Sequence, residues 1–274
     1  MAGTLPAAPA RAAVTLGQLP STAPTPECSS TADFLQPSIT GGNLYIARQA
    51  GTITSWSTRS AGGDATYVFK IFRRTSDPDV FQVIARAPPH ELTAGLNTVP
   101  VSIAVRSGDM IGVNESGDPN SCTFSQLGDG VLTRGGSVGV GASGSFAPLN
   151  DVRLNLSAVL VPSNDFSVAS ITRDRKRGTA TVIVNVSNPG IVTIAGKGLK
   201  KRPPKNVAVA GTIQFKIATV GAKKRKLEKT GKVAVTPTIN FFPSGGEQGT
   251  QAFTIKLKQR RRPPASLLGR PDGP

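Results

Sequence analysis

Histidine, cysteine and the polar aromatic residues are scarce in this chain of 274 residues, which holds one His, two Cys, one Trp and two Tyr. A zinc site needs three or four protein ligands, so one histidine without a neighbouring cysteine predicts no metal centre. No stretch approaches the roughly 20 apolar residues that a membrane-spanning helix requires. Hydrolase nucleophile elbows and phosphate-binding loops lead into a helix, which the Gly-rich stretches here lack. We therefore expect a non-enzymatic protein without a cofactor.

Long segments with helical periodicity are absent as well. Apolar residues recur mostly at every second position, in short runs bounded by Gly, Pro, Asn or Asp. This alternation is typical of β-strands, whose successive side chains point to opposite faces. The 30 Gly and 22 Pro are spread between these runs, as turn residues are in β-domains. The sequence predicts an all-β fold.

Charge is distributed unevenly along the chain, whose net charge is +16. Residues 1–162 hold 10 basic and 11 acidic residues, whereas residues 163–274 hold 22 and 5. Such a shift marks a domain boundary, and residues 161–165 are the expected linker. We predict four regions: a leader at 1–13, a jelly-roll-like β-sandwich at 14–162, a basic immunoglobulin-like β-sandwich at 163–259 and a disordered tail at 260–274.

The expected strands share period-2 alternation and turn residues at their ends. In the first domain they are 43–47, 51–59, 65–74, 80–87, 98–106, 109–114 and 152–161; in the second they are 166–172, 179–186, 190–196, 206–210, 212–219, 232–241 and 250–258. Residues 65–74 are apolar on both faces, which favours a central strand. The Gly/Ser-rich residues 128–148 form either a long loop or a weak edge, and residues 222–230 predict one or two helical turns.

The first 13 residues resemble the end of a signal peptide, because Ala10-Arg11-Ala12 fits an A-x-A cleavage pattern. The charged and apolar parts that come before such a pattern are missing, and the alternative is a disordered Ala/Pro leader. Export favours pairing of Cys28 with Cys122, because disulfides persist in oxidising compartments. We expect a secreted or cell-surface protein with a Cys28–Cys122 disulfide.

Several longer stretches resemble known sequences. AGLNTVPVSIAVRSGDMIGV (94–113) is similar to a β-sandwich segment of uncharacterised exported proteins of soil actinobacteria. A Lys-rich immunoglobulin-like repeat of the same proteins resembles NDFSVASITRDRKRGTATVIVNV (164–186), TIAGKGLKK (193–201), AKKRKLEKTGKVAV (222–235) and FFPSGGEQGTQAFTIKLK (241–258). The resemblance covers most of residues 94–258. It implies export and a structural or adhesive role, and it carries over no catalytic residues.

Acidic residues of the first domain are candidates for paired-carboxylate chemistry such as glycoside hydrolysis. They are Asp64, Asp77, Asp79, Asp109, Glu115, Asp118 and Asp129. All lie beside Gly, Pro or Ser, where Asp commonly caps turns, so a glycan-active enzyme is the most distant alternative. Residues 77–79 and 114–118 offer oxygen ligands for weak Ca²⁺ binding but match no 12-residue calcium loop. His90 follows two prolines and is expected in a solvated loop.

Trp56 is the candidate for stacking against a sugar ring, which needs an exposed aromatic face. It follows Ile53 by three positions, so a regular strand would place the two residues on opposite faces. Threonines share the face of Trp56, which predicts exposure of the indole. The other interpretation is a core tryptophan, and the sequence leaves both open.

Basic clusters in the second domain are the strongest functional pattern. They comprise Arg173, Arg175, Lys176 and Arg177; Lys200, Lys201, Arg202 and Lys205; Lys223, Lys224, Arg225 and Lys226; and residues 260–262. One interpretation is a solubilising surface. The other is contact with a polyanion: a cell-wall phosphate polymer, an acidic polysaccharide or nucleic acid. Lysines without interleaved aromatics favour nonspecific attraction. We predict an exported structural or adhesive protein attached to anionic polymers, with nucleic-acid binding as the alternative.

Overall fold

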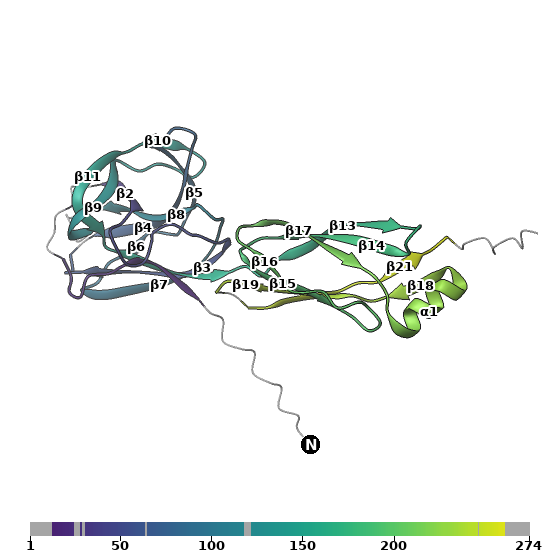
Figure 1. Cartoon of the computed structure of the whole chain (residues 1–274). Coiled ribbons are helices and arrows are strands. Elements are labelled where there is room, and N and C mark those ends of the chain that lie inside the picture. The colour runs from purple at the N-terminus through teal and green to yellow at the C-terminus, as the bar shows by residue number, and fades with distance from the viewer. Residues whose placement is uncertain are drawn as a thin grey trace, which may run out of the picture. The chain divides into compact units, whose positions relative to one another are not determined.

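The computed structural model describes residues 13–24, 28, 31–63, 65–117, 122–245 and 247–260. Strands dominate these residues, and α1 (Gly221–Thr230) is the helix among them (Figure 1). The prediction of an all-β chain is confirmed. The chain divides into two compact units after Ser163, one residue from the expected boundary. The expected leader at 1–13 and tail at 260–274 lie almost entirely outside the described residues.

The first unit is a β-sandwich of two sheets, with strand orders β1-β12-β3-β7 and β10-β5-β4-β8-β2-β9-β11, and β6 beside β4. Their inner faces share one apolar core. The first four strands alternate between the sheets, whereas β4–β6 and β8–β11 are consecutive strands of the larger sheet, and the jelly-roll subtype stays a prediction. The strands are β1 Val14–Gln18, β2 Ala32–Ser38, β3 Gly51–Ser60, β4 Thr66–Arg74, β5 Val80–Arg86, β6 His90–Glu91, β7 Gly95–Val105, β8 Met110–Ser116, β9 Thr123–Gly135, β10 Ser143–Ser145, β11 Ala147–Leu154 and β12 Leu156–Pro162.

The larger sheet is buried on both faces near β4, as the apolar residues at 65–74 predict. Phe69 and Ile71 belong to the core between the sheets, whereas Phe72 belongs to a second apolar cluster. Val138 and Phe146 complete this second cluster. They come from residues 136–146, which we call the covering segment. The Gly/Ser-rich region is therefore not one long loop. It contains the end of β9, the covering segment, the short edge strand β10 and the start of β11, which is the strand at the other edge, so the expectation of a weak edge is met in part.

The two cysteines form the predicted disulfide. The Cα atoms of Cys28 and Cys122 are 6.0 Å apart, and both residues are buried. The bridge ties the chain before β2 to the start of β9. The expected strand at 43–47 is wrong, since only Ile46 forms an isolated bridge, to Met110. Backbone bonds of Tyr45 and Ala47 go to residues 108–111 and that of Leu44 goes to Gly17, which is too short a run of pairing to form a strand ladder.

The second unit contains three sheets, ordered β13-β14-β17, β16-β15-β19-β20 and β18-β21, around its own core. Residues 250–258 form two strands rather than the one expected, because β20 pairs with β19 and β21 pairs with β18. The immunoglobulin-like subtype stays a prediction. The strands are β13 Phe166–Asp174, β14 Thr179–Val186, β15 Gly190–Ala195, β16 Lys205–Val207, β17 Gly211–Ile217, β18 Lys232–Val235, β19 Thr238–Pro243, β20 Gly249–Ala252 and β21 Ile255–Lys258.

The helical turns expected at 222–230 are present as α1. Gly231 ends the helix in the left-handed conformation (φ 70°), and its N–H donates to the carbonyl oxygen of Leu227 at 2.7 Å. Glycine adopts this conformation without a steric penalty, which is why it commonly follows a helix. Leu227 is the buried residue of α1, Lys223 and Thr230 are half-buried, and the other helical residues are exposed.

Candidate polyanion-binding surface

The first basic cluster lies in the turn between β13 and β14. A carboxylate oxygen of Asp174 accepts hydrogen bonds from the backbone N–H groups of Lys176 (2.9 Å) and Arg177 (3.0 Å). The bond from Arg177 is the main cause of the lowered pKa of Asp174. This capped turn leaves the side chains of Arg173, Arg175, Lys176 and Arg177 exposed.

Backbone hydrogen bonds connect this turn to the end of α1. The N–H of Arg260 donates to the carbonyl oxygen of Arg175, and the N–H of Gln259 donates to that of Gly231, both at 2.8 Å. The residues after β21 therefore lie between the turn and the helix. In Figure 1, α1 lies beside β18 and β21 at one end of the second unit.

The second basic cluster is on α1 itself. Lys224, Arg225 and Lys226 are exposed. Lys223 is half-buried, and its Nζ donates to the carbonyl oxygen of Ala234 in β18 at 2.9 Å. Lys223 thus anchors the helix to the sheet, while the other three cations are available to a ligand.

The third basic cluster follows β15 and reaches the start of α1. The N–H of Lys200 donates to the carbonyl oxygen of Ala218 at 2.8 Å, three residues before the helix begins. Nε of Arg202 donates to the carbonyl oxygen of Lys216, also at 2.8 Å. The three clusters are separated in the sequence but meet around α1. The first lies beside the residues that follow β21, the second is on the helix, and the third lies beside the residues that come before the helix.

β18 and β21 add lysines that the sequence clusters do not contain. Lys232 lies directly opposite Lys258, and Lys256 lies opposite Ala234. These lysines alternate with buried residues, so they face solvent. Like charges directly opposite each other destabilise a strand pair, and an anion between them would relieve the repulsion. In the sequence, these lysines alternate with apolar residues in KVAV (232–235) and IKLK (255–258), and this alternation already indicates that they face solvent.

We call this region the basic end. Its cations are Arg173, Arg175, Lys176, Arg177, Lys200, Lys201, Arg202, Lys216, Lys223, Lys224, Arg225, Lys226, Lys229, Lys232, Lys256, Lys258 and Arg260. Within the described part of this region, acidic side chains come from Asp174 and Glu228, and Glu228 lies 3.8 Å from Lys224. The excess of positive charge creates a potential that attracts polyanions from a distance.

Trp56 is not the exposed stacking platform that the strand pattern predicts. Its side chain is fully buried and stacks on Phe69, with ring centroids 5.9 Å apart. The alternation fails because β3 carries an extra residue, Thr54, against β12. This bulge turns Ile53 and Trp56 to the same face. His90 is half-buried with its ring edge-on to Trp56, so the expected solvated position is also wrong.

Two of the acidic residues considered for catalysis in the first unit, Asp109 and Asp77, instead stabilise the fold. Asp109 accepts two hydrogen bonds from the guanidinium of Arg73, at 2.7 and 2.9 Å. A carboxylate oxygen of Asp77 caps its own turn by accepting from the N–H of Asp79 at 3.1 Å. Asp64 and Asp118 lie outside the described residues.

Asp129 belongs to a buried polar network at the edge of the core. It forms an ion pair with Arg153, and Thr40 donates to it through its N–H and its hydroxyl, both at 2.7 Å. Burial opposes ionisation of this carboxyl, but the hydrogen bonds from Arg153 and Thr40 together lower its pKa. The network holds the chain after β2 against β9 and β11, which is a structural role.

Two glycine spacings known from catalytic and cofactor-binding loops occur at 135–144: G-x-S-x-G (135–139) and G-x-G-x-x-G (139–144). Neither leads into a helix, because this stretch ends β9 and runs along the covering segment into β10. The hydroxyl of Ser137 accepts a hydrogen bond from Lys70 at 2.9 Å. We infer a structural role for this serine.

Metal donors come together at one place in the described part of the chain. Cys28, Glu115 and Cys122 place donor atoms within 4.8 Å of one another. Two of the three belong to the disulfide, so they offer no thiolate to a metal. Among the described residues, no helix is long and apolar enough to cross a membrane.

Comparisons with known proteins give only distant structural likeness. No protein-family model and no curated protein matches the chain. The GH2 β-galacturonidase from Eisenbergiella tayi bound to galacturonate is similar at a TM-score of 0.25 and 11% identity, over 90% of this chain and 44% of that one. The FMN-binding β-glucuronidase from Facaelibacterium prausnitzii L2-6 is similar at 0.22 and 9%, over 92% and 40%. The chain spans less than half of either, and likeness at this level carries no argument about function.

Proposed function

We propose that this is a non-enzymatic exported protein of the cell surface or extracellular matrix, and that the basic end attaches it to anionic polymers. The observation that carries the proposal is the convergence of separated basic segments around α1, β18 and β21. The disulfide in the first unit supports an oxidising compartment. Cell-wall phosphate polymers and acidic polysaccharides are the ligand classes that this charge suits.

The type of side chain favours loose electrostatic attachment. Lysine is a compact, strongly hydrated point charge, whereas bidentate recognition relies on arginine. Phe215 and Phe241 are buried, and the exposed Phe242 lies opposite Ile191 in β15 rather than among the residues of the basic end, so the basic end has no aromatic platform for stacking bases among these residues. Binding should therefore depend on charge density and salt, and little on the identity of the polymer.

A salt titration of the full-length protein tests the proposal. The probes are a poly(glycerol phosphate), a neutral dextran and duplex DNA. We expect binding to both polyanions at low salt, none to dextran, and steep weakening as salt rises, because each contact releases counterions. Absence of binding to every polyanion at low salt contradicts the proposal. Severalfold preference for one DNA sequence instead supports a nucleic-acid-binding role.

Two variants that each lose three positive charges test whether binding depends on the basic end or only on the net charge of the protein. Replacing Lys224, Arg225 and Lys226 by Gln removes three exposed cations from α1. Replacing Arg74, Arg86 and Arg106 by Gln removes three exposed cations from the first unit. On duplex DNA, the slope of log K against log salt becomes shallower by roughly 0.9 for every phosphate that a cation no longer neutralises. We expect this change only for the α1 variant, and equal changes for both variants argue against a localised site.

A further inference from the structure

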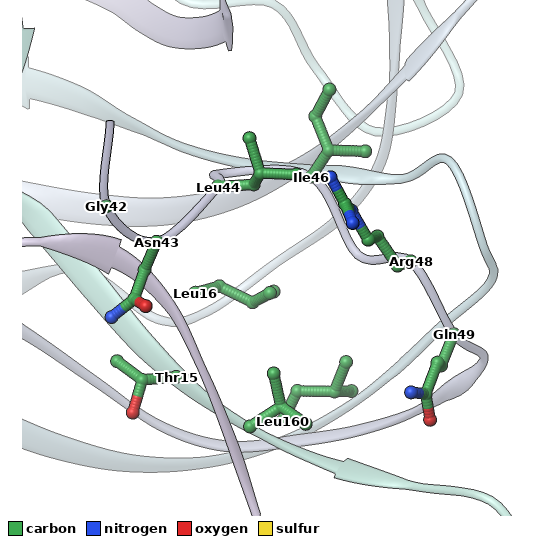
Figure 2. Close-up of a pocket in the computed structure, with 10 residues that line it drawn as sticks. Thr15, Leu16, Gly42, Asn43, Leu44, Ile46, Arg48, Gln49 and Leu160 are labelled. Atoms are coloured by element: carbon green, nitrogen blue, oxygen red, sulfur yellow. The ribbon is translucent and has the colours of Figure 1, made fainter. Parts of the chain in front are cut away.

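The first unit buries a lysine and an aspartate side by side. They do not line the cavity of about 280 Å³ between β1 and residues 42–49, which includes the core residues Leu16 and Leu160 (Figure 2). The side chains of Lys70 and Asp33 are instead both fully buried. A lysine amine is a nucleophile when it is neutral, and a carboxyl group is an acyl donor. The pair plays no part in the proposed polyanion binding.

The two residues meet across one intervening strand of the larger sheet. Lys70 is in β4 and Asp33 is in β2, and β8 lies between these strands. Gly112 of β8 pairs with Lys70, and a Cβ at Gly112 would lie 2.7 Å from the ring of Phe72. Because glycine has no side chain on this face, the lysine side chain can cross β8. Its Nζ lies 2.6 Å from Oδ1 of Asp33.

The surroundings of the pair oppose charge. Leu35 and Phe72 of the second apolar cluster lie two residues beyond Asp33 and Lys70 on their strands, and therefore on the same face. Burial lowers the pKa of Lys70 from its ordinary value, although the hydrogen bond from the lysine to Asp33 opposes this shift. Transfer of one proton from the ammonium to the carboxylate removes two buried charges and leaves an amine and a carboxylic acid. An amine can attack a carbonyl carbon, whereas an ammonium cannot.

The hydrogen bonds around the pair match those that acyl transfer needs. The hydroxyl of Ser137 and the carbonyl oxygen of Val138 both accept from Nζ at 2.9 Å, which holds the nitrogen beside Asp33. Cγ of Asp33 is bonded to Oδ1, so the nitrogen is near the separation of about 3–3.5 Å from which such reactions start. The N–H of Val138 donates to Oδ2 at 2.7 Å, where it can stabilise the negative charge of a tetrahedral intermediate.

We propose that Lys70 and Asp33 condense into an intramolecular isopeptide bond, and that the ion pair is the state before condensation. The ammonium first gives a proton to Oδ1. The lone pair of Nζ then attacks Cγ and forms a C–N bond, and negative charge develops on Oδ2 beside the N–H of Val138. A second proton passes from the nitrogen to Oδ1, the C–Oδ1 bond breaks, Oδ2 becomes the amide oxygen, and one water molecule leaves.

The condensation needs no oxidant, reductant or other reactant. Ser137 is exposed, so the released water has a short path to solvent. The bond joins β4 to β2 across β8 and links residues 37 positions apart in the sequence. Unlike the disulfide, it survives a reducing agent, which suits a structural or adhesive protein.

Intact mass spectrometry of the full-length protein, denatured and with its disulfide reduced, tests the proposal. We expect a mass lower by one water molecule than the sequence requires. Lys70→Arg keeps the positive charge but has no nucleophilic amine, so this variant should have the full mass of its sequence. Lys224→Arg, the matched change at an exposed lysine, should keep the loss. A wild-type protein of full mass overturns the proposal.

Tryptic digestion of the wild-type protein locates the bond and does not depend on the folding of a variant. Trypsin does not cleave after an acylated lysine, so the condensed protein should yield a branched peptide that joins residues 12–48 to residues 60–73. Cleavage after Lys70 into linear peptides overturns the proposal even if the intact mass lacks one water, because the loss then lies elsewhere. Neither measurement involves polyanion binding.

Discussion

At the scale of single residues, the buried ion pair between Lys70 and Asp33 stands out in the first unit. Nζ of Lys70 lies 2.6 Å from a carboxylate oxygen of Asp33 and donates to Ser137 and to the carbonyl oxygen of Val138, both at 2.9 Å. The other oxygen of Asp33 accepts the N–H of Val138 at 2.7 Å. Both charged groups are fully buried, so they depend on each other and on the covering segment.

Lys70→Met should destabilise the first unit by about 3–5 kcal/mol, because it leaves the carboxylate of Asp33 buried without its partner. Urea denaturation followed by the fluorescence of Trp56 measures this, since that residue is the single tryptophan and lies in the first unit. Arg86→Met, at an exposed position, should change the free energy of unfolding by no more than about 0.5 kcal/mol. Equal stability of the Lys70 variant and the wild type contradicts the structural role.

At the scale of elements, two glycines with left-handed backbone differ in what surrounds them. Gly178, in the β13–β14 turn, has a φ of 67°, and a Cβ there would lie 2.8 Å from the side chain of Leu227. Gly221, at the start of α1, has a φ of 55° and open space around it. The turn that carries the first basic cluster is thus packed directly on the helix that carries the second.

Gly221→Ala should destabilise the second unit by about 1–2 kcal/mol, the penalty of left-handed backbone for a residue with a Cβ. Gly178→Ala should lose about 1–3 kcal/mol more, because the methyl group also displaces Leu227. Hydrogen exchange of the β14 amides measures both losses. Indistinguishable protection in the two variants would show that the turn does not pack on α1.

At the scale of the whole molecule, each unit has its own core and only the first has a disulfide. The bridge spans 94 residues of sequence, so its stabilisation comes largely from restricting the unfolded chain. The two units should therefore respond differently to a reducing agent, although they belong to one chain.

Reduction of the disulfide should destabilise the first unit by roughly 4 kcal/mol in the loop-entropy account and leave the second unchanged. The fluorescence of Trp56 reports the first unit, and amide exchange in β14 reports the second. The variant with both cysteines replaced by serine should behave like the reduced protein. Equal loss of protection in both units would mean that they unfold as one.

The sequence alone determined the properties that depend on local pattern. Period-2 alternation predicts strands because neighbouring side chains of an extended chain point to opposite faces. The charge shift near residue 163 requires only counting, and the pairing of two cysteines leaves one possibility within the chain. The helical turns expected at 222–230 rest on a run of mostly good helix formers, whereas the role of Gly231 in ending α1 became evident only in the structure.

Tertiary structure decided the properties that depend on which strands pair and in which register. Trp56 is buried because Thr54 forms a bulge against β12, a feature that neither strand encodes by itself. Lys232 and Lys258 become neighbours only when β18 pairs with β21. The basic end brings together residues that are distant in the sequence, and such contacts follow from packing of the whole unit rather than from any local run of residues.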